Sequence, residues 1–436
     1  MGSYIPSTPA ERSAMLAELG LKTPDDLFAH LPAAVRTHEL NIPNGLSELE
    51  VSRVMEGMAS RNTQFTSIFR GAGAYWHYIP AIVRTVTSKE EFLTSYTPYQ
   101  AEISQGVLQS IFEYQTQICE LTGMDVSNAS MYDGASASAE AVFMCEERKR
   151  SGVVLSDSVD PQIREVIATY CESRGVPVVV LPSRDGVTDC EAVKAALAGG
   201  TPASVFVQSP NYWGLIEPVA DLAEIAHGSS AKLIMNANPV SLGMLKTPAE
   251  LGADIAVGEG QPLGLPLSFG GPYIGYLACR KDLMRRLPGR IVGQTEDNQG
   301  RRCFVLTLQA REQHIRREKA SSNICSNEAL CAMTVSVYLA SIGAEGLERA
   351  ARASYANAHY LAEELDKAGF HRVHAKEFFH EFLTECPVDA QMLCQKLADA
   401  GILCGLPVDG RLLWCCTEMN SRADIEKLLS VIREVC

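Results

Sequence analysis

A run of small and polar residues, 130–137, stands directly before a segment that favours a helix, 138–149. Small residues at a helix start leave backbone N–H groups free, and the helix dipole attracts an anion towards them. Tyr132, Asp133 and Gly134 are therefore candidates for a turn that binds a phosphate group. A capped, tightly packed helix start has the same composition, so this segment alone leaves both interpretations open.

Two later segments also carry polar groups next to apolar runs. The run 232–236 ends in Asn236, and strand ends in open α/β sheets face the ligand crevice. An aspartate at such a place could pair with a protonated pyridine nitrogen, but an asparagine brings no charge. The glycine-rich loop 258–272 contains Gln261 and matches neither a Walker loop nor a dinucleotide-binding loop. Taken alone, each of these two segments indicates only a tight connection.

The elements that would position these residues alternate between short apolar runs and helical patterns. Such alternation predicts right-handed βαβ units and a mostly parallel sheet. The runs are apolar throughout, which is typical of strands covered by helices on both faces. We predict strands at 153–156, 177–181, 204–208, 232–236, 254–257 and 274–278, and helices at 105–122, 161–174 and 221–227.

The two ends of the chain have different sequence patterns from the central part. Residues 1–65 form a predicted helical segment, with start signals at Thr8, Thr23 and Ser47. The large α/β domain is predicted to span 66–300, and a small α+β domain 301–436. The patterns expected in the small domain are helices at 327–352, 354–368, 388–400 and 421–434 and strands at 378–383 and 411–416.

Composition excludes several classes of function. The chain has 436 residues and a net charge of −14, which argues against binding to nucleic-acid phosphates. It has no run of about 18 apolar residues, so we expect no membrane span. The 14 cysteines are scattered, without a CxxC pair or a histidine at metal-ligand spacing, so we expect no metal site. A soluble, cytoplasmic protein with reduced thiols is the expectation.

Together, the three segments follow the order used by fold-type-I pyridoxal-phosphate enzymes: phosphate turn, pyridine-facing strand, then lysine loop. Four longer stretches make the resemblance specific: 69–83 (FRGAGAYWHYIPAIV), 94–141, 258–278 (GEGQPLGLPLSFGGPYIGYLA) and 311–330 (REQHIRREKASSNICSNEAL). They resemble the N-terminal half of the glycine cleavage system P-protein, over nearly the whole chain. The length points to the form of that family in which this half is a separate subunit. The resemblance implies a fold-type-I transferase-like large domain.

In that family two homologous halves share one working cofactor site, and the half resembled here is the one without the lysine. The lysine's place falls on Gln261, whose amide cannot form an imine, and the pyridine aspartate's place falls on Asn236. Lys246, Lys281 and Lys319 lie elsewhere. The resemblance therefore implies a vestigial pocket at Tyr132, Asp133, Gly134, Asn236 and Gln261, and pyridoxal phosphate bound covalently by the partner subunit.

The implied activity belongs to a pair of subunits, expected to assemble as an α2β2 heterotetramer. The pair would decarboxylate glycine and pass the aminomethyl group to the lipoyl arm of H-protein, and this chain alone would be inactive. An independent enzyme with a displaced lysine is disfavoured by Gln261. A purely structural subunit, which stabilises its partner without touching the cofactor, stays open.

Two segments are candidates for completing the partner's active site. Tyr96, Tyr99 and Gln100 offer stacking faces and hydrogen-bonding groups in a segment that Pro98 stiffens; packing at the subunit interface is the alternative. The turn 321–323 resembles the one by which related enzymes reach a neighbour's cofactor phosphate, and a cap for the following helix is the alternative. Its residues are Ser321, Ser322 and Asn323.

Overall fold

The computed structural model describes residues 7–37, 40–96, 98–324 and 326–435. They fall into two units, Met1–Thr63 and Gln64–Cys436, each described by itself. The sequence placed a boundary at 65, close to this division, and its further boundary at 300 stays a prediction.

The first unit is built from short helices with strong start signals. Helix α1 (Pro9–Glu18) begins with a capping box between Thr8 and Glu11, and α2 (Glu48–Ala59) begins with one between Ser47 and Glu50. A 3₁₀ turn, Pro24–Phe28, lies between them. None of the described residues of this unit is buried. The start signals expected from the sequence are confirmed, because capping is a local interaction.

A seven-stranded sheet forms the centre of the second unit. Its strand order is β2-β10-β9-β8-β7-β3-β4, and the five strands from β9 to β4 run parallel. Strand β10 is antiparallel to both β9 and β2. The strands are β2 (Val126–Ser127), β3 (Val153–Ser156), β4 (Val178–Leu181), β7 (Ser204–Gln208), β8 (Lys232–Asn236), β9 (Ile255–Glu259) and β10 (Gly275–Cys279).

Helices cover both faces of this sheet, as the continuous apolar strands predicted. On one face, residues of α5, α8, α9 and α11 pack against alternate strand positions such as Val154 and Val205. On the other face, α6 and α7 pack against the intervening positions, such as Leu155 and Phe206. The helices are α5 (Gln105–Thr122), α6 (Gly134–Cys145), α7 (Pro161–Arg174), α8 (Cys190–Leu197), α9 (Val219–Gly228) and α11 (Ala329–Lys367).

Helix α6 begins four residues earlier than the sequence indicated. Asp133 is its N-cap and forms a capping box with Ser136. Gly134 lies so close to strand β9 that an added Cβ would meet the backbone nitrogen of Glu259 at 2.7 Å. Gly134 and the three residues after it form the first turn of the helix, so this segment has the capped, tightly packed helix start that the sequence analysis gave as one of its two interpretations.

Helix α11 joins the sheet to the C-terminal part of the chain. It runs from Ala329 to Lys367 and is broken at Gly343, whose φ of 63° is unfavourable for other residues. The two helical patterns predicted from the sequence are confirmed, but the break lies at Gly343 rather than near 353. Its length and apolar composition would allow a membrane span. Residues such as Ala332, Val335 and Ala351 instead pack in the core of the second unit.

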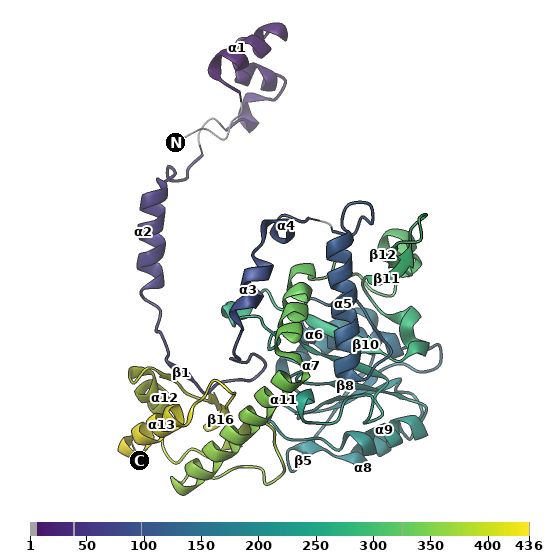
Figure 1. Cartoon of the computed structure of the whole chain (residues 1–436), viewed down its shortest axis with the longest axis vertical. Helices are drawn as coiled ribbons and strands as arrows, with labels where there is room; N and C mark the ends of the chain where they lie inside the picture. Colours follow the sequence, from purple (N-terminus) through teal and green to yellow (C-terminus); the bar gives the residue numbers. More distant parts are fainter. Residues whose placement is uncertain (1–6, 38–39, 97, 325, 436) are drawn as a thin grey trace. The chain divides into compact units, whose positions relative to one another are not determined.

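The C-terminal elements enclose a core of their own. Strands β13, β16 and β15 form an antiparallel sheet that shares a core with α12 and α13. Figure 1 shows these two helices in yellow. Phe69 and Leu215 also enter this core, and strand β1 pairs in parallel with β14. The elements are β1 (Ser67–Ile68), β13 (Glu381–Thr384), α12 (Ala390–Asp399), β14 (Ile402–Leu403), β15 (Leu406–Val408), β16 (Arg411–Cys415) and α13 (Arg422–Val435).

The remaining elements are short connections. The hairpin β11–β12 was not expected from the sequence, and it packs on α5 through Val292 and Phe304. These elements are α3 (Ala81–Thr87), α4 (Glu90–Leu93), β5 (Ser183–Arg184), β6 (Val187–Thr188), β11 (Ile291–Glu296), β12 (Arg302–Thr307), α10 (Gln313–Arg316) and 3₁₀ turns at 33–35, 241–243, 268–270, 281–286, 309–311 and 317–319.

Candidate functional site

A cavity of about 680 Å³ lies where the parallel strands of the sheet end. The ends of β7, β8 and β9 reach it through Gln208, Asn236 and Glu259, and the start of α6 reaches it through Asp133. In an open α/β sheet this is the usual place for a ligand. Four of the five predicted pocket residues line the cavity: Tyr132, Asp133, Gly134 and Asn236.

The N-terminus of α6 is occupied by carboxylates of the chain itself. The N–H of Gly134 donates to Oε2 of Glu259 at 3.0 Å, and the N–H of Ser136 donates to Oδ1 of Asp133 at 2.7 Å. These are donors that a bound phosphate would need. The chain therefore uses two N–H groups of the helix start for its own hydrogen bonds and keeps them from an external anion.

Glu259 is held in place by three backbone groups. Besides Gly134, the N–H groups of Gln261 and Ile274 donate to its Oε1 at 3.0 and 3.3 Å. Burial raises the pKa of Glu259 to about 7, and the three hydrogen bonds oppose that shift without cancelling it. The sequence analysis did not single out this residue, although a glutamate at the end of an apolar strand was a visible signal.

Asn236 ends strand β8 at the place where the resemblance implies a charged partner for the cofactor ring. Its Nδ2 donates to Oγ of Ser138 at 3.1 Å, and that hydroxyl donates to the carbonyl of Gly134 at 2.7 Å. The asparagine is buried and carries no charge. It therefore links β8 to helix α6 by neutral hydrogen bonds.

Gln261 does not line this cavity and borders a neighbouring one of about 350 Å³. Its Oε1 accepts from the N–H of Tyr75 at 2.8 Å, and its Nε2 donates to the carbonyls of Tyr75 and Leu265 at 3.0 and 2.8 Å. The side chain is 1% exposed. At the expected lysine position the structure thus has an amide that ties two loops together.

Pyridoxal phosphate does not fit the described residues of this cavity. Its lining contains no lysine or arginine, two N–H groups at the start of α6 already donate to carboxylates of the chain, and Asn236 offers no charge. A covalently held, phosphate-bearing cofactor needs an amine and free anion donors at these places. The chemistry that the chain itself can supply here is hydrogen bonding and negative charge.

The wall opposite α6 comes from the C-terminal part of the chain. Glu381 is 4% exposed, and it accepts from the N–H of Ala72 at 2.6 Å and from the hydroxyl of Tyr75 at 2.7 Å. Burial raises the pKa of Glu381 to about 7. His380 is 2% exposed and neither of its ring nitrogens has a hydrogen-bond partner. Sequence reasoning missed both, and their only signal was a pair of polar residues within the apolar run predicted as the strand 378–383.

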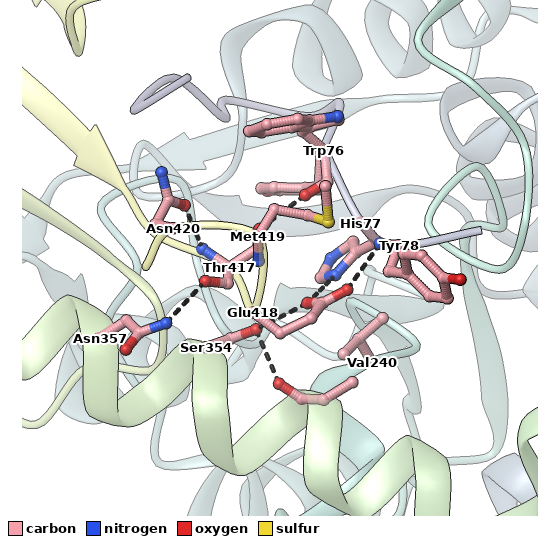
Figure 2. Close-up of polar contacts among 12 residues, drawn as sticks. Trp76, His77, Tyr78, Val240, Ser354, Asn357, Thr417, Glu418, Met419 and Asn420 are labelled. Carbon is pink, nitrogen blue, oxygen red and sulfur yellow. Dashed lines mark hydrogen bonds and ion pairs between the residues drawn. The ribbon is translucent and has the colours of Figure 1, made fainter. Parts of the chain in front are cut away.

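A second polar cluster fixes the loop that follows Tyr75, as Figure 2 shows. Glu418 accepts from the N–H of Tyr78 at 2.7 Å and lies 2.7 Å from Nδ1 of His77. Burial acts to raise the pKa of Glu418, but the hydrogen bond and charge of His77 outweigh it and lower the pKa. Thr417 donates to the carbonyl of Trp76 at 2.6 Å. The cluster thus anchors the loop to the end of β16.

The residues predicted to contact the partner subunit differ in their exposure and in the hydrogen bonds that they already make within the chain. Tyr96 is 95% exposed, and Gln100 is exposed as well. Tyr99 donates its hydroxyl to Oδ1 of Asn327 at 2.7 Å, and the guanidinium of Arg290 lies 3.9 Å from its ring centre. Thr97, between them, lies outside the described residues. Tyr96 and Gln100 are therefore free for contacts with another molecule, whereas the Tyr99 hydroxyl is already used.

The turn 321–323 is also joined to its own chain. Oγ of Ser322 donates to Oε1 of Glu140 on α6 at 2.7 Å, and the carbonyl of Ser321 accepts from Arg174 at 3.0 Å. Asn323 borders a separate cavity beside α6 and α7. No contact in the described part of the chain makes this turn a cap of α11, whose first residue is Ala329.

Comparisons with known proteins agree with the resemblance seen in the sequence. A family model described as "Glycine cleavage system P-protein" matches residues 2–432. The "Probable glycine dehydrogenase (decarboxylating) subunit 1" of Moorella thermoacetica is 49% identical and aligns over 99% of each chain. A crystal structure of glycine decarboxylase (P-protein), in inhibitor-bound form, is 42% identical with a TM-score of 0.94 and full coverage of both chains.

A more distant neighbour bears on the fold alone. Alanine–glyoxylate aminotransferase from Nostoc has a TM-score of 0.61 at 14% identity, covering 95% of this chain and all of its own. The fold-type-I architecture expected from the sequence is thereby confirmed.

Proposed function

Because the chain belongs to the glycine cleavage system P-protein family, we propose that it is the subunit without the cofactor lysine in a two-chain glycine decarboxylase. A second subunit holds pyridoxal phosphate through its own lysine. The pair decarboxylates glycine and transfers the aminomethyl group to the lipoyl arm of H-protein. The words "subunit 1" in the name of the Moorella relative support a partner chain. We place the pair in the cytoplasm, as an α2β2 assembly.

Two sets of contacts support the assignment of the cofactor to the partner. Gln261 uses both ends of its amide on Tyr75 and Leu265, and Glu259 accepts from the first N–H of α6. The first arrangement removes the covalent anchor, and the second removes a phosphate donor. In this chain, Gln261 and Glu259 therefore stabilise the fold through hydrogen bonds to other parts of the chain.

A purely structural role remains the second candidate function, and two contacts favour it. The hydroxyl groups of Tyr99 and Ser322, which could have served the partner's site, donate to Asn327 and Glu140. Tyr96 and Gln100 favour the first candidate, since both side chains are exposed. Their substitution distinguishes a subunit that completes the site from one that only supports it.

The test combines labelling with activity. Each subunit is incubated alone with pyridoxal phosphate, reduced with borohydride and mapped by peptide mass. We expect stoichiometric labelling of the partner subunit and none of this chain. Glycine–CO₂ exchange should need both chains. A specific label on one lysine of this chain, or exchange by this chain alone, would contradict the proposal.

A further inference from the structure

We propose that Arg290 is a positioning residue for the active site that the two subunits form together. Its guanidinium aligns three segments of this chain, 96–100, 312–315 and 321–326, against the second subunit. This role rests on the proposed function, because it needs a partner whose active site these segments reach. It follows from three contacts of one side chain, from the exposed residues beside each contact, and from the support of Arg290 by the main chain.

The guanidinium of Arg290 contacts all three segments. Its carbon atom lies 3.9 Å from the ring centre of Tyr99, in the first segment. Its Nε lies 4.0 Å from Oε2 of Glu312, in the second, and its Nη1 donates to Oγ of Ser326 at 3.3 Å, in the third. One planar cation therefore uses its face and two of its nitrogens on segments that lie far apart in the sequence.

Each segment combines one residue that contacts Arg290 with exposed residues close by in the chain. The side chains of Arg290 and Glu312 are 17% and 11% exposed, whereas Tyr96 is 95% and Ile315 52% exposed. Exposed side chains on irregular segments keep one direction only where neighbouring residues fix the backbone. By holding one residue of each segment, Arg290 therefore sets where its neighbours point. The exposed neighbours are Tyr96, Gln100, His314, Ile315, Ser321 and Asn323.

The main chain holds Arg290 firmly against the core. Arg290 stands directly before strand β11, which Figure 1 labels, and its carbonyl accepts from the N–H of Ala129 at 2.8 Å. Ala129 is fully buried, and its own carbonyl accepts from Nδ2 of Asn327 at 3.4 Å. Asn327 in turn accepts from the hydroxyl of Tyr99 at 2.7 Å. These contacts close a ring from Arg290 through Tyr99, Asn327 and Ala129 back to Arg290, so the guanidinium acts from a fixed base.

The three contacts need an arginine and not merely a positive charge. A guanidinium is planar, carries five N–H donors in a fixed arrangement and stacks on an aromatic ring. The ammonium group of a lysine is compact and strongly hydrated, so it can meet the ring, the carboxylate or the hydroxyl but cannot align all three. Replacement of Arg290 by lysine therefore keeps the charge and removes the alignment.

A residue that only stabilises the chain is the alternative, and it fits less well. An ion pair at 4.0 Å and a single cation–π contact each contribute modestly to stability. Tyr99 packs at the margin of a small apolar cluster, and Ser326 is exposed. The contacts of Arg290 therefore join surface segments to one another and add little to the apolar core.

The test uses the complex of both subunits. Arg290→Lys should leave assembly intact, and glycine–CO₂ exchange should fall roughly 10- to 100-fold, since a displacement of about 1 Å in an active site costs on this scale. Arg302→Lys is the matched control, because Arg302 also lies over an aromatic ring, Phe304 at 5.5 Å, but is exposed on the hairpin. The control should keep full exchange. Full exchange by fully assembled Arg290→Lys overturns the proposal.

Two readouts separate alignment from a loss of stability. The visible absorption of the partner's pyridoxal phosphate on addition of glycine should change in Arg290→Lys and stay unchanged in Arg302→Lys. If Arg290 acts through the segment of Tyr96, the double variant with Tyr96→Phe should lose less kcat than the product of the two single losses. Losses that multiply in fully assembled complexes, or an unchanged spectrum in Arg290→Lys, overturn the proposal.

A second variant and the wild-type pair keep the remaining outcomes apart. Should Arg290→Lys lose its cooperative melting transition, Glu312→Gln takes its place, since it removes only the ion pair. It should lower exchange about threefold, and unchanged exchange overturns the proposal. If the wild-type pair exchanges no CO₂, the proposed function fails and the role of Arg290 fails with it. Exchange by the wild-type pair that the assembled variants retain in full removes the role of Arg290 alone.

Discussion

The backbone N–H of Gly134 donates to Oε2 of Glu259 at 3.0 Å, and so joins residues 125 positions apart. The contact closes the start of α6 against the end of β9. It turns a helix N-terminus, which in this class of fold is suited to a phosphate, into part of the structural frame.

Replacing Glu259 should destabilise the chain because three buried N–H groups depend on it. Glu259→Ala leaves the N–H groups of Gly134, Gln261 and Ile274 without an acceptor. Each such loss costs about 1 kcal/mol or more, so we expect a decrease on the order of 3 kcal/mol in the free energy of unfolding. Glu259→Gln keeps one acceptor oxygen and should lose clearly less. Urea denaturation measures both, and equal values would contradict the role of the carboxylate.

The buried carboxyl groups should make stability fall as the pH rises. Glu259 and Glu381 each have a pKa raised by burial from 4.5 to about 7. The folded state then holds protons that the unfolded state has lost, so their contribution is full below pH 4.5 and is lost as the pH rises through about 7. The difference in unfolding free energy between wild type and Glu381→Gln should change in this window. A difference that is constant from pH 4.5 to 7.5 would disagree with the raised pKa.

Glu418 should show the opposite dependence. Its pKa is lowered by His77 against the effect of burial, so its contribution is present above pH 4.5 and is lost as the pH falls. Glu418→Gln should cost about 1–3 kcal/mol near neutral pH, as for hydrogen bonds to charged groups. Thermal melts from pH 3 to 8 test this, and the cost should shrink towards pH 3. A cost that grows in acid would show that His77 does not stabilise the carboxylate.

A lysine at position 261 should not create a cofactor site. Gln261→Lys removes the acceptor for the N–H of Tyr75, and the position does not line the 680 Å³ cavity. We expect a lower melting temperature, no borohydride-stable pyridoxyl group, and no glycine decarboxylation without the partner. Gln261→Met is the matched control, since it has similar length and no amine. Decarboxylation by Gln261→Lys alone would show that the neutral Asn236 is sufficient opposite the ring.

Substitution of Tyr96 should lower the activity of the two-subunit complex without changing the stability of the isolated chain. Its side chain is 95% exposed, so Tyr96→Phe should leave the melting temperature of the isolated chain unchanged. If its hydroxyl bonds a polar group in the partner's site, the loss of about 1–3 kcal/mol lowers glycine–CO₂ exchange roughly 5- to 150-fold. Gln100→Ala should act in the same direction.

Tyr99→Phe is the comparison, because its hydroxyl bonds Asn327 within the chain and its loss should lower stability first. Size measurement of the complex separates lost assembly from lost rate. Full exchange by fully assembled Tyr96→Phe and Gln100→Ala would leave the chain as a scaffold.

Local patterns in the sequence were enough to predict most of the sheet and its helices. Strands β3, β7 and β8 have the predicted bounds, because strands buried on both faces are short, continuously apolar runs. Helices α5 and α7 also match, the second with Asp160 as its cap and Gly175 at its end. The prediction that Gln261 stands at the place of a cofactor lysine also needed only the sequence, since it depends on the identity of one residue within a recognisable loop.

The contents of the site were decided by tertiary structure. Gln261 binds Tyr75 across 186 positions, and Glu381 meets Tyr75 across 306. Periodicity reports which face of an element is buried, but not which distant side chain lies opposite, because that depends on strand order and loop paths. Only the folded chain brought Glu259 to the start of α6 and placed Glu381 in the wall opposite that helix. The segment that the sequence left open between a phosphate turn and a packed helix start thereby became a helix start that donates to carboxylates of the chain.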